Sequence, residues 1–99
     1  GGSASSHEIE DAVVALPGVS AAAAVGRPDE EAGESIVLFY VSTPDVDVTE
    51  DQVRTHCRAT LAKHMVPRSI RLVDALPLNE NGKLVKARVR DMVRGAGEA

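Results

Sequence analysis

The stretch that most restricts the fold of this chain is Val19–Gly26, which consists mainly of small and branched apolar residues. Pro17-Gly18 precedes it and Arg27-Pro28 follows it, so residues that interrupt helices enclose it on both sides. Its four alanines favour a helix, but the space between the two interruptions is too short for a stable one. The stretch therefore predicts a short, buried β-strand.

Two further stretches predict strands that would join it in a sheet. Ser35–Val41 is β-branched and aromatic, and we expect both of its faces to be covered. A polar connection links it to the first strand, so these two strands should pair antiparallel. Ser69–Val73 alternates, with Ile70 and Leu72 on the same side, and predicts a third strand.

Helices are predicted near both ends of the chain. Ser5 and Glu8 fit a capping box, and the apolar residues after them recur at helical spacing. These residues are Ile9, Ala12, Val13 and Leu16. A last helix is predicted by the apolar stripe of Val85, Val89, Met92 and Val93. The basic residues off that stripe are expected to face solvent, and they are Lys86, Arg88, Arg90 and Arg94.

A third helix is predicted between the second and third strands. Thr49 and Gln52 fit a second capping box, which would start a helix from Glu50 to about Ala62. Its inner stripe consists of Val53, Cys57 and Leu61. We therefore expect Cys57 to pack in the core rather than act as a nucleophile, and its neighbour His56 to be exposed.

The predicted order is α-β-β-α-β-α, which defines an α+β fold with helices packed against a small three-stranded sheet. The 99 residues suffice for one small domain. We assign residues 6–94 to this domain and residues 95–99 to a disordered tail. Residues 1–5 are assigned to a flexible lead-in, which is either a hinge remnant or a linker.

Composition narrows the classes of partner. With one Phe, one Tyr and no Trp, the chain lacks aromatic platforms for base stacking, so we expect no nucleic acid partner. No apolar run is long enough to cross a membrane, and a single cysteine permits no internal disulfide, so we expect a cytoplasmic location and no membrane contact. Ten of the eleven basic residues lie in 53–99, and this basic half suits a phosphate ligand or an acidic partner.

The turn in Leu76–Lys83 is the feature most suggestive of function. Asn81-Gly82 tolerates positive φ and predicts a tight turn, which would hold Lys83 away from its own domain. The ammonium group then suits a phosphate or carboxylate on another molecule, although a solvated lysine at a hairpin tip has the same pattern. His56 and His64 do not have a catalytic spacing, and we find no metal-ligand spacing and no nucleophile–base pair. The chain alone therefore resembles a lid or an interaction module more than a complete enzyme.

Five motifs in order carry a resemblance to a known family. They are His7–Ala12, Pro17–Val19, Val25–Asp29, Leu61–Pro67 and Leu76–Lys83. Together they resemble the C-terminal domain of the ATP-dependent adenylate-forming ligases, which include the acyl-CoA synthetases and the adenylation domains of nonribosomal peptide synthetases. The resemblance covers roughly residues 5–94, although the hinge residue and the glycine-containing loop of the family are reduced here to Gly1–Ala4.

The resemblance implies a lid that closes over an active site in a separate N-terminal ATP-binding domain. A substrate carboxylate would attack ATP to give an acyl-adenylate, and a thiol would then take the acyl group. Lys83 matches the family lysine of the first step, and Gly82 and Arg68 are candidates for positioning substrate or phosphate. ATP and Mg²⁺, with coenzyme A or phosphopantetheine, would belong to the full-length enzyme. We expect no ligand on this part alone, and no activity from it.

The resemblance also implies a regulatory role for Lys83. The spacing from Pro77 to Gly82-Lys83 resembles the pattern that bacterial protein lysine acetyltransferases recognise. Acetylation would remove the charge of Lys83 and so switch the first step off.

Three functions stay open at this point. We favour the lid of an acyl-CoA synthetase over the lid of an amino-acid adenylation domain from a nonribosomal peptide synthetase. The third is a stand-alone interaction module, which would bind an acidic carrier protein or regulator through the basic half of the chain.

Overall fold

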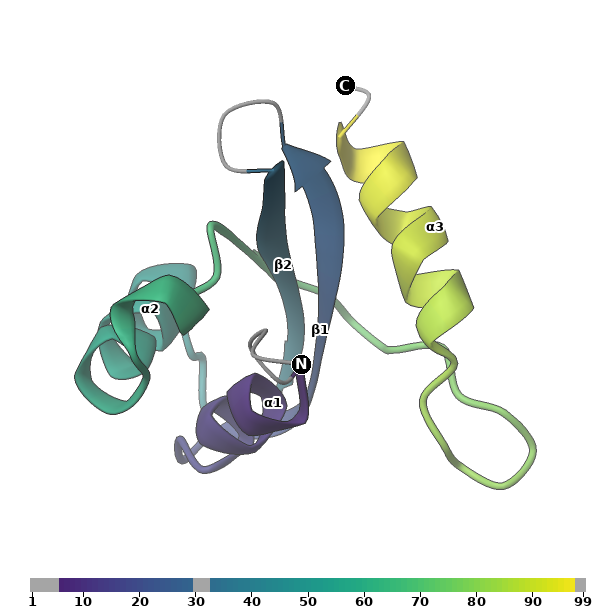
Figure 1. The fold of residues 1–99 in the computed structure, drawn as a ribbon. Coiled ribbons are helices and arrows are strands. Elements are labelled where there is room, and N and C mark those ends of the chain that lie inside the picture. The colour runs from purple at the N-terminus through teal and green to yellow at the C-terminus, as the bar shows by residue number, and fades with distance from the viewer. Residues whose placement is uncertain (1–5, 30–32, 98–99) are drawn as a thin grey trace.

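The computed structural model describes residues 6–29 and 33–97 (Figure 1). Its elements follow the predicted order α-β-β-α-β-α, and the α+β fold is confirmed. The helices are α1 (Ser6–Val14), α2 (Glu50–Thr60) and α3 (Lys86–Gly97), with a short 3₁₀ turn, η1 (Lys63–Met65). The strands are β1 (Val19–Asp29), β2 (Gly33–Ser42) and β3 (Ser69–Leu72).

The sheet has the order β1-β2-β3, so β2 is its central strand. β1 and β2 pair antiparallel, as expected, and β3 pairs parallel to β2. β1 runs to Asp29 rather than ending at Gly26, because the two antiparallel strands stay paired as far as Asp29 and Gly33. Pro28 is tolerated there because β1 is an edge strand, where a missing N–H leaves no neighbour unpaired.

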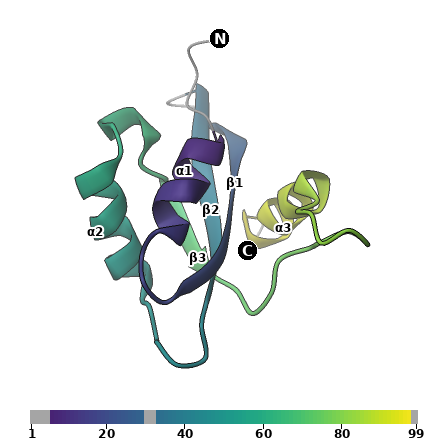
Figure 2. The ribbon, with the colours of Figure 1, turned by 90° about the horizontal axis from the view of Figure 1, so that it is seen from below.

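Helices cover both faces of the sheet, with α1 and α2 on one face and α3 on the other (Figures 1 and 2). Because side chains alternate along a strand, neighbouring residues of β1 and β2 enter two separate apolar clusters. The cluster beneath α1 and α2 includes Ile9, Val13, Leu38, Tyr40, Val53 and Cys57. The cluster beneath α3 consists of Ala23, Val25, Val37, Phe39 and Val89. The apolar packing of α3 is therefore separate from that of the other two helices.

The start of α2 follows the prediction closely. The Thr49 hydroxyl accepts the N–H of Gln52, and the Gln52 side chain accepts the N–H of Thr49, so the capping box is confirmed. The helix ends at Thr60, before the expected Ala62, because Leu61 is extended. Cys57 is fully buried, as expected, and burial raises the pKa of its thiol.

One prediction for a single side chain is wrong. His56 is half-buried rather than exposed, because its Nε2 atom lies 2.7 Å from the carbonyl oxygen of Ala12 and links α2 to α1. The third strand ends at Leu72 rather than at the expected Val73, and Leu72 at its end is exposed whereas Ile70 is buried.

The assignment of the chain ends stays a prediction. α3 continues to Gly97, beyond the expected domain boundary at residue 94. Residues 1–5 and 98–99, including the Ser5 half of the first capping box, lie outside the described residues. The described helices lack the length and apolar character that a membrane crossing requires.

Candidate catalytic loop

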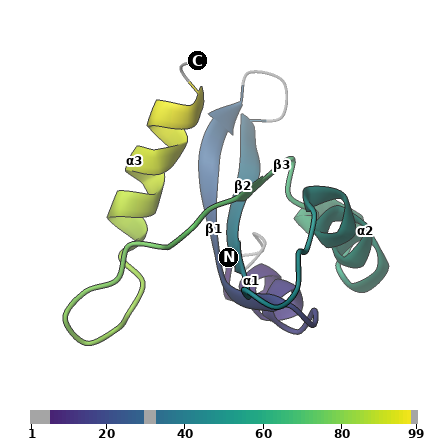
Figure 3. The ribbon, with the colours of Figure 1, turned by 180° about the vertical axis from the view of Figure 1, so that it is seen from behind.

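The loop between β3 and α3 projects away from the sheet (Figure 3). Its two sides are held together as in a hairpin, with an antiparallel bridge between Leu78 and Leu84. Inside this bridge, the N–H of Asn79 donates to the carbonyl oxygen of Lys83 over 2.8 Å. The backbone of Lys83 therefore has a defined place although the loop lies outside the core.

Asn79 is the centre of the loop. Its Oδ1 atom accepts the N–H of Asn81 at 2.8 Å and that of Lys83 at 3.0 Å. Sequence reasoning assigned the turn to Asn81-Gly82 and missed Asn79, although an Asn side chain commonly accepts the N–H two residues further on. The predicted turn is present, and of the two residues expected to tolerate positive φ, Gly82 has φ of +80° and Asn81 does not have positive φ.

The Lys83 side chain is exposed, and no side chain that the structure describes forms a hydrogen bond or ion pair with its ammonium group. An ammonium group tied to a local carboxylate would have argued against a role outside the domain. Here the loop fixes the backbone of the lysine and leaves its charge available. This arrangement suits a cation that acts on a group carried by another domain.

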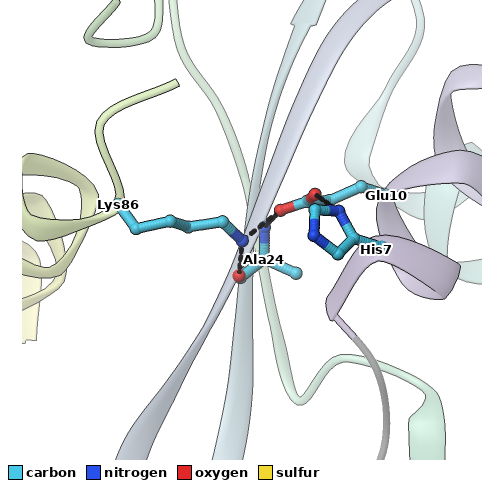
Figure 4. Close-up of polar contacts among 4 residues, drawn as sticks. All are labelled: His7, Glu10, Ala24 and Lys86. Carbon is cyan, nitrogen blue, oxygen red and sulfur yellow. Dashed lines mark hydrogen bonds and ion pairs between the residues drawn. The ribbon is translucent and has the colours of Figure 1, made fainter. Parts of the chain in front are cut away.

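Lys86, at the start of α3, has the opposite environment (Figure 4). Its Nζ atom donates to the Oε2 atom of Glu10, on α1, and to the carbonyl oxygen of Ala24, on β1, at 2.5 Å. The same Oε2 atom accepts the N–H of Ala24 at 2.8 Å. The prediction that Lys86 faces solvent is therefore wrong: its side chain is 29% exposed and that of Glu10 is 12% exposed.

The sheet explains why these three residues meet. Ile36 and Tyr40 direct their carbonyl groups toward the β3 side, where the N–H groups of Arg68 and Val73 donate to them. By the alternation of an antiparallel ladder, Ala24, opposite Leu38, therefore directs its own N–H and C=O away from β2. Glu10 and Lys86 satisfy these two groups, in the place that a further strand would occupy.

Lys83 and Lys86 line one open pocket of about 500 Å³ at the junction of α1, β1 and α3. The other charged or titratable groups in its lining are His7, Glu10 and Arg90. Among the residues that the structure describes, Glu10 is the only carboxylate in that lining, and it is already paired with Lys86. The pocket is therefore basic on the side from which Lys83 projects.

Arg68 and Gly82 were expected to position substrate or phosphate. Gly82 shapes the turn next to Lys83. Arg68 precedes β3 and is not among the residues that line this pocket. Cys57 lies in the core beneath α2, so it is not part of the loop region. Among the described residues, no three His, Cys, Asp or Glu side chains gather as a metal site would require.

An α+β domain with helices on both faces of its sheet (Figure 2), whose loop presents a lysine without a partner among the described side chains, fits the class predicted from the five motifs, the C-terminal domain of adenylate-forming ligases. The family model for the AMP-binding enzyme C-terminal domain matches residues 8–83, and the chain belongs to this family.

Curated relatives are acyl-CoA ligases. The chain is 43% identical over 84 residues to the 3-[(3aS,4S,7aS)-7a-methyl-1,5-dioxo-octahydro-1H-inden-4-yl]propanoyl:CoA ligase of Rhodococcus jostii, covering 85% of this chain and 16% of that protein. It is 39% identical over 89 residues to a long-chain-fatty-acid–CoA ligase of Escherichia coli O6:H1, covering 90% of this chain and 16% of that ligase. The chain thus spans about a sixth of the length of these relatives.

Solved structures agree with this family assignment. Apo MatB from Rhodopseudomonas palustris superposes with a TM-score of 0.84 at 32% identity, over 92% of this chain and 18% of that one. A fatty acyl CoA synthetase from Mycobacterium tuberculosis gives a TM-score of 0.82 at 32% identity, over 90% of this chain and 18% of that one. The amide bond synthetase McbA from Marinactinospora thermotolerans gives 0.82 at 32% identity, over 88% of this chain and 18% of that one.

Proposed function

We propose that this domain is the lid of an ATP-dependent acid–thiol ligase and that Lys83 serves its first half-reaction. The observation that carries the proposal is the contrast within one pocket. Lys86 is held by Glu10, whereas Lys83 is exposed and has no partner among the described side chains. A lysine held in this way can reach an active site that the rest of the enzyme supplies.

The chemistry of that half-reaction needs such a cation. A carboxylate oxygen attacks the α-phosphorus of ATP, the acyl-adenylate forms, and pyrophosphate leaves. Two anions must approach each other, so the barrier depends on positioning and charge compensation. An ammonium group between the carboxylate and the nucleotide lowers that repulsion. When the lid turns away, the thiol sulfur can attack the acyl carbonyl carbon and release AMP.

We assign ATP, Mg²⁺ and the thiol to the longer enzyme, whose N-terminal domain is the partner of this chain. Coenzyme A is the favoured thiol, because the names of the two curated relatives above describe CoA ligases. A carrier-protein pantetheine, as in an amino-acid adenylation domain, is the second candidate. A cytoplasmic location, expected from the single cysteine, belongs to the same proposal.

The stand-alone interaction module remains the alternative from another class. The basic half of the chain supports it, since an acidic carrier protein or regulator could dock there. Salt-sensitive binding of such a protein to the 99-residue chain would favour the module. Adenylation restored by mixing the chain with its N-terminal domain would favour the lid.

The decisive experiment changes Lys83→Ala in the full-length enzyme. We expect carboxylate-dependent ATP–pyrophosphate exchange to fall by about a hundredfold or more, because the charge acts in the transition state. Thioester formation from supplied acyl-adenylate should stay within about threefold of wild type. Lys63→Ala, at an exposed lysine on η1, is the matched control and should leave both steps unchanged. Equal losses of both steps in Lys83→Ala would refute the assignment.

A further inference from the structure

We propose that Lys86 is a positioning residue for Lys83: by occupying Glu10 at the edge of β1, it anchors the loop and keeps Glu10 from capturing the Lys83 ammonium group. This inference rests on the proposed function of Lys83. It assigns a role to two residues that do not touch the substrate.

The first step is the anchoring of the loop. Lys83 is separated from Lys86 by two residues only, and Lys86 is the first residue of α3. Its ammonium group bonds to α1 through Glu10 and to β1 through Ala24. The loop thus re-enters the domain at a polar contact with two other elements, three residues after the lysine that it presents.

The second step concerns what else holds α3. Among the α3 side chains that the structure describes, the buried contact with the sheet is Val89, one turn further along, with Met92 partly buried beside the same cluster. Apolar packing is non-directional and allows a helix to shift along its axis or rotate. The hydrogen bonds of Lys86 to two fixed acceptors set that position, and so set where the loop ends.

The third step is electrostatic. Glu10 is the only carboxylate that lines the pocket in the described part of the chain, and its side chain is only 12% exposed. Removing Lys86 would leave this carboxylate with the Ala24 N–H at 2.8 Å and the Nδ1 atom of exposed His7 at 3.7 Å, and without its ammonium partner, in a poorly solvated place where a charge favours a new counter-ion. The other cations in the lining are Lys83 and Arg90, with His7 beside them as a titratable group. Lys83 precedes position 86 by three residues, and we expect its ammonium group to pair with Glu10 in place of Lys86.

Capture of Lys83 by Glu10 would hold the catalytic charge inside its own domain. A lid in that state could still close and still serve thioester formation, but it would bring no ammonium group to the adenylation site. Loss of Lys86 should therefore resemble loss of Lys83 in the first half-reaction. It should also be relieved by removing the charge of Glu10, which a purely structural role of the ion pair does not predict.

The test uses the full-length enzyme and both half-reactions. In Lys86→Met, we expect ATP–pyrophosphate exchange to fall about tenfold or more, with thioester formation from supplied acyl-adenylate within about threefold of wild type. The double variant Glu10→Gln/Lys86→Met should recover at least about threefold over Lys86→Met. Lys86→Arg should retain more activity than Lys86→Met. Arg88→Met removes an exposed cation from the same helix and is the matched control.

Three outcomes would overturn the inference: exchange in Lys86→Met within about twofold of wild type, no recovery in the double variant, or parallel loss of both half-reactions. Lys83→Ala in the same series separates the two proposals. If Lys83→Ala leaves adenylation intact, the proposed function fails. If Lys83→Ala abolishes adenylation but Lys86→Met does not impair it, the positioning role alone fails.

A second measurement does not depend on turnover. In the 99-residue chain with ¹³C-labelled lysine, the Cε signal of Lys86 should shift as Glu10 is protonated, and that of Lys83 should not. In Lys86→Met, the Cε signal of Lys83 should acquire this response. A Lys83 signal that stays insensitive in Lys86→Met would contradict capture. If Lys86→Met does not fold, Glu10→Gln tests the contact, since it should abolish the response of the Lys86 signal.

Discussion

The Oδ1 atom of Asn79 accepts the backbone N–H of Lys83 at 3.0 Å, so a side chain on one side of the loop fixes the presented lysine on the other. The same atom accepts the N–H of Asn81. Asn79→Ala removes both bonds, and we expect ATP–pyrophosphate exchange in the full-length enzyme to fall about tenfold, because the lysine loses its fixed place. Global stability should fall by only about 1 kcal/mol, since the site is exposed.

Two variants serve as controls for Asn79→Ala. Asn79→Asp keeps an acceptor oxygen and should retain most of the activity. Asn81→Ala changes a neighbouring amide on the same exposed loop and should have little effect. Loss of adenylation in Asn79→Ala that merely follows a general loss of folding, measured by urea unfolding, would argue against a local role.

Gly82 and Gly18 offer a matched pair that separates the loop from the fold. Both have positive φ, at +80° and +100°. A Cβ atom on Gly82 would meet nothing within 4 Å, so Gly82→Ala costs only backbone strain, about 1 kcal/mol of unfolding free energy. A Cβ atom on Gly18 would lie 2.6 Å from Val48 Cγ2, so Gly18→Ala should cost about 3 kcal/mol.

The two glycine variants should rank in one order for loss of stability and in the opposite order for loss of adenylation activity. Gly82→Ala should impair adenylation more, because relief of the strained φ moves the adjacent Lys83 backbone. Gly18→Ala should chiefly lower the urea midpoint. A Gly82→Ala enzyme with wild-type exchange would show that adenylation tolerates movement of the turn.

The order of elements and the exposed turn that carries Lys83 could be predicted because their signals are local. Thr49 and Gln52 are three residues apart and cap one helix, and Asn81-Gly82 marks one turn. The contacts of Lys86 could not be predicted, because Glu10 lies 76 residues away and both residues have the spacing of ordinary helix surface. His56 was wrongly placed for the same reason, since its acceptor, Ala12, is 44 residues away. Asn79 could have been found, because its bond to Asn81 spans two residues.

Acetylation should distinguish the two lysines of the pocket. Lys83 is exposed and unpaired among the described side chains. The ammonium group of Lys86 instead donates hydrogen bonds to the Glu10 carboxylate and the Ala24 carbonyl oxygen. With a bacterial protein lysine acetyltransferase and acetyl-CoA, we expect mass spectrometry to find modification of Lys83 well ahead of Lys86. Exposed Lys63, outside the Pro77–Lys83 pattern, reports non-specific reaction. Absence of acetyl-Lys83, or equal labelling of Lys63 and Lys83, would count against regulation at this site.

Tyr40 should make the stability of the domain fall at alkaline pH. Its hydroxyl group donates to the carbonyl oxygen of Val48 at 2.6 Å in the core. Burial raises the pKa of Tyr40 above its usual 10.0, and the nearby charges of Glu50 and Asp47 raise it further. The folded state therefore favours the neutral phenol. This contribution is fully present below the unfolded-state pKa, near 10.0, and is lost as the pH rises through the higher folded-state pKa.

Tyr40→Phe tests this contribution directly. Near neutral pH it should lower the free energy of unfolding by about 1–2 kcal/mol, because the buried Val48 carbonyl loses its donor. Urea unfolding from about pH 8 to about pH 11 should show a shallower decline in the variant than in wild type, so the two curves converge as the phenol of wild type ionises. Cys57, whose pKa is also raised by burial, is present in both proteins and leaves the difference unaffected. Curves that stay parallel over that range would mean that Tyr40 does not contribute to the pH dependence.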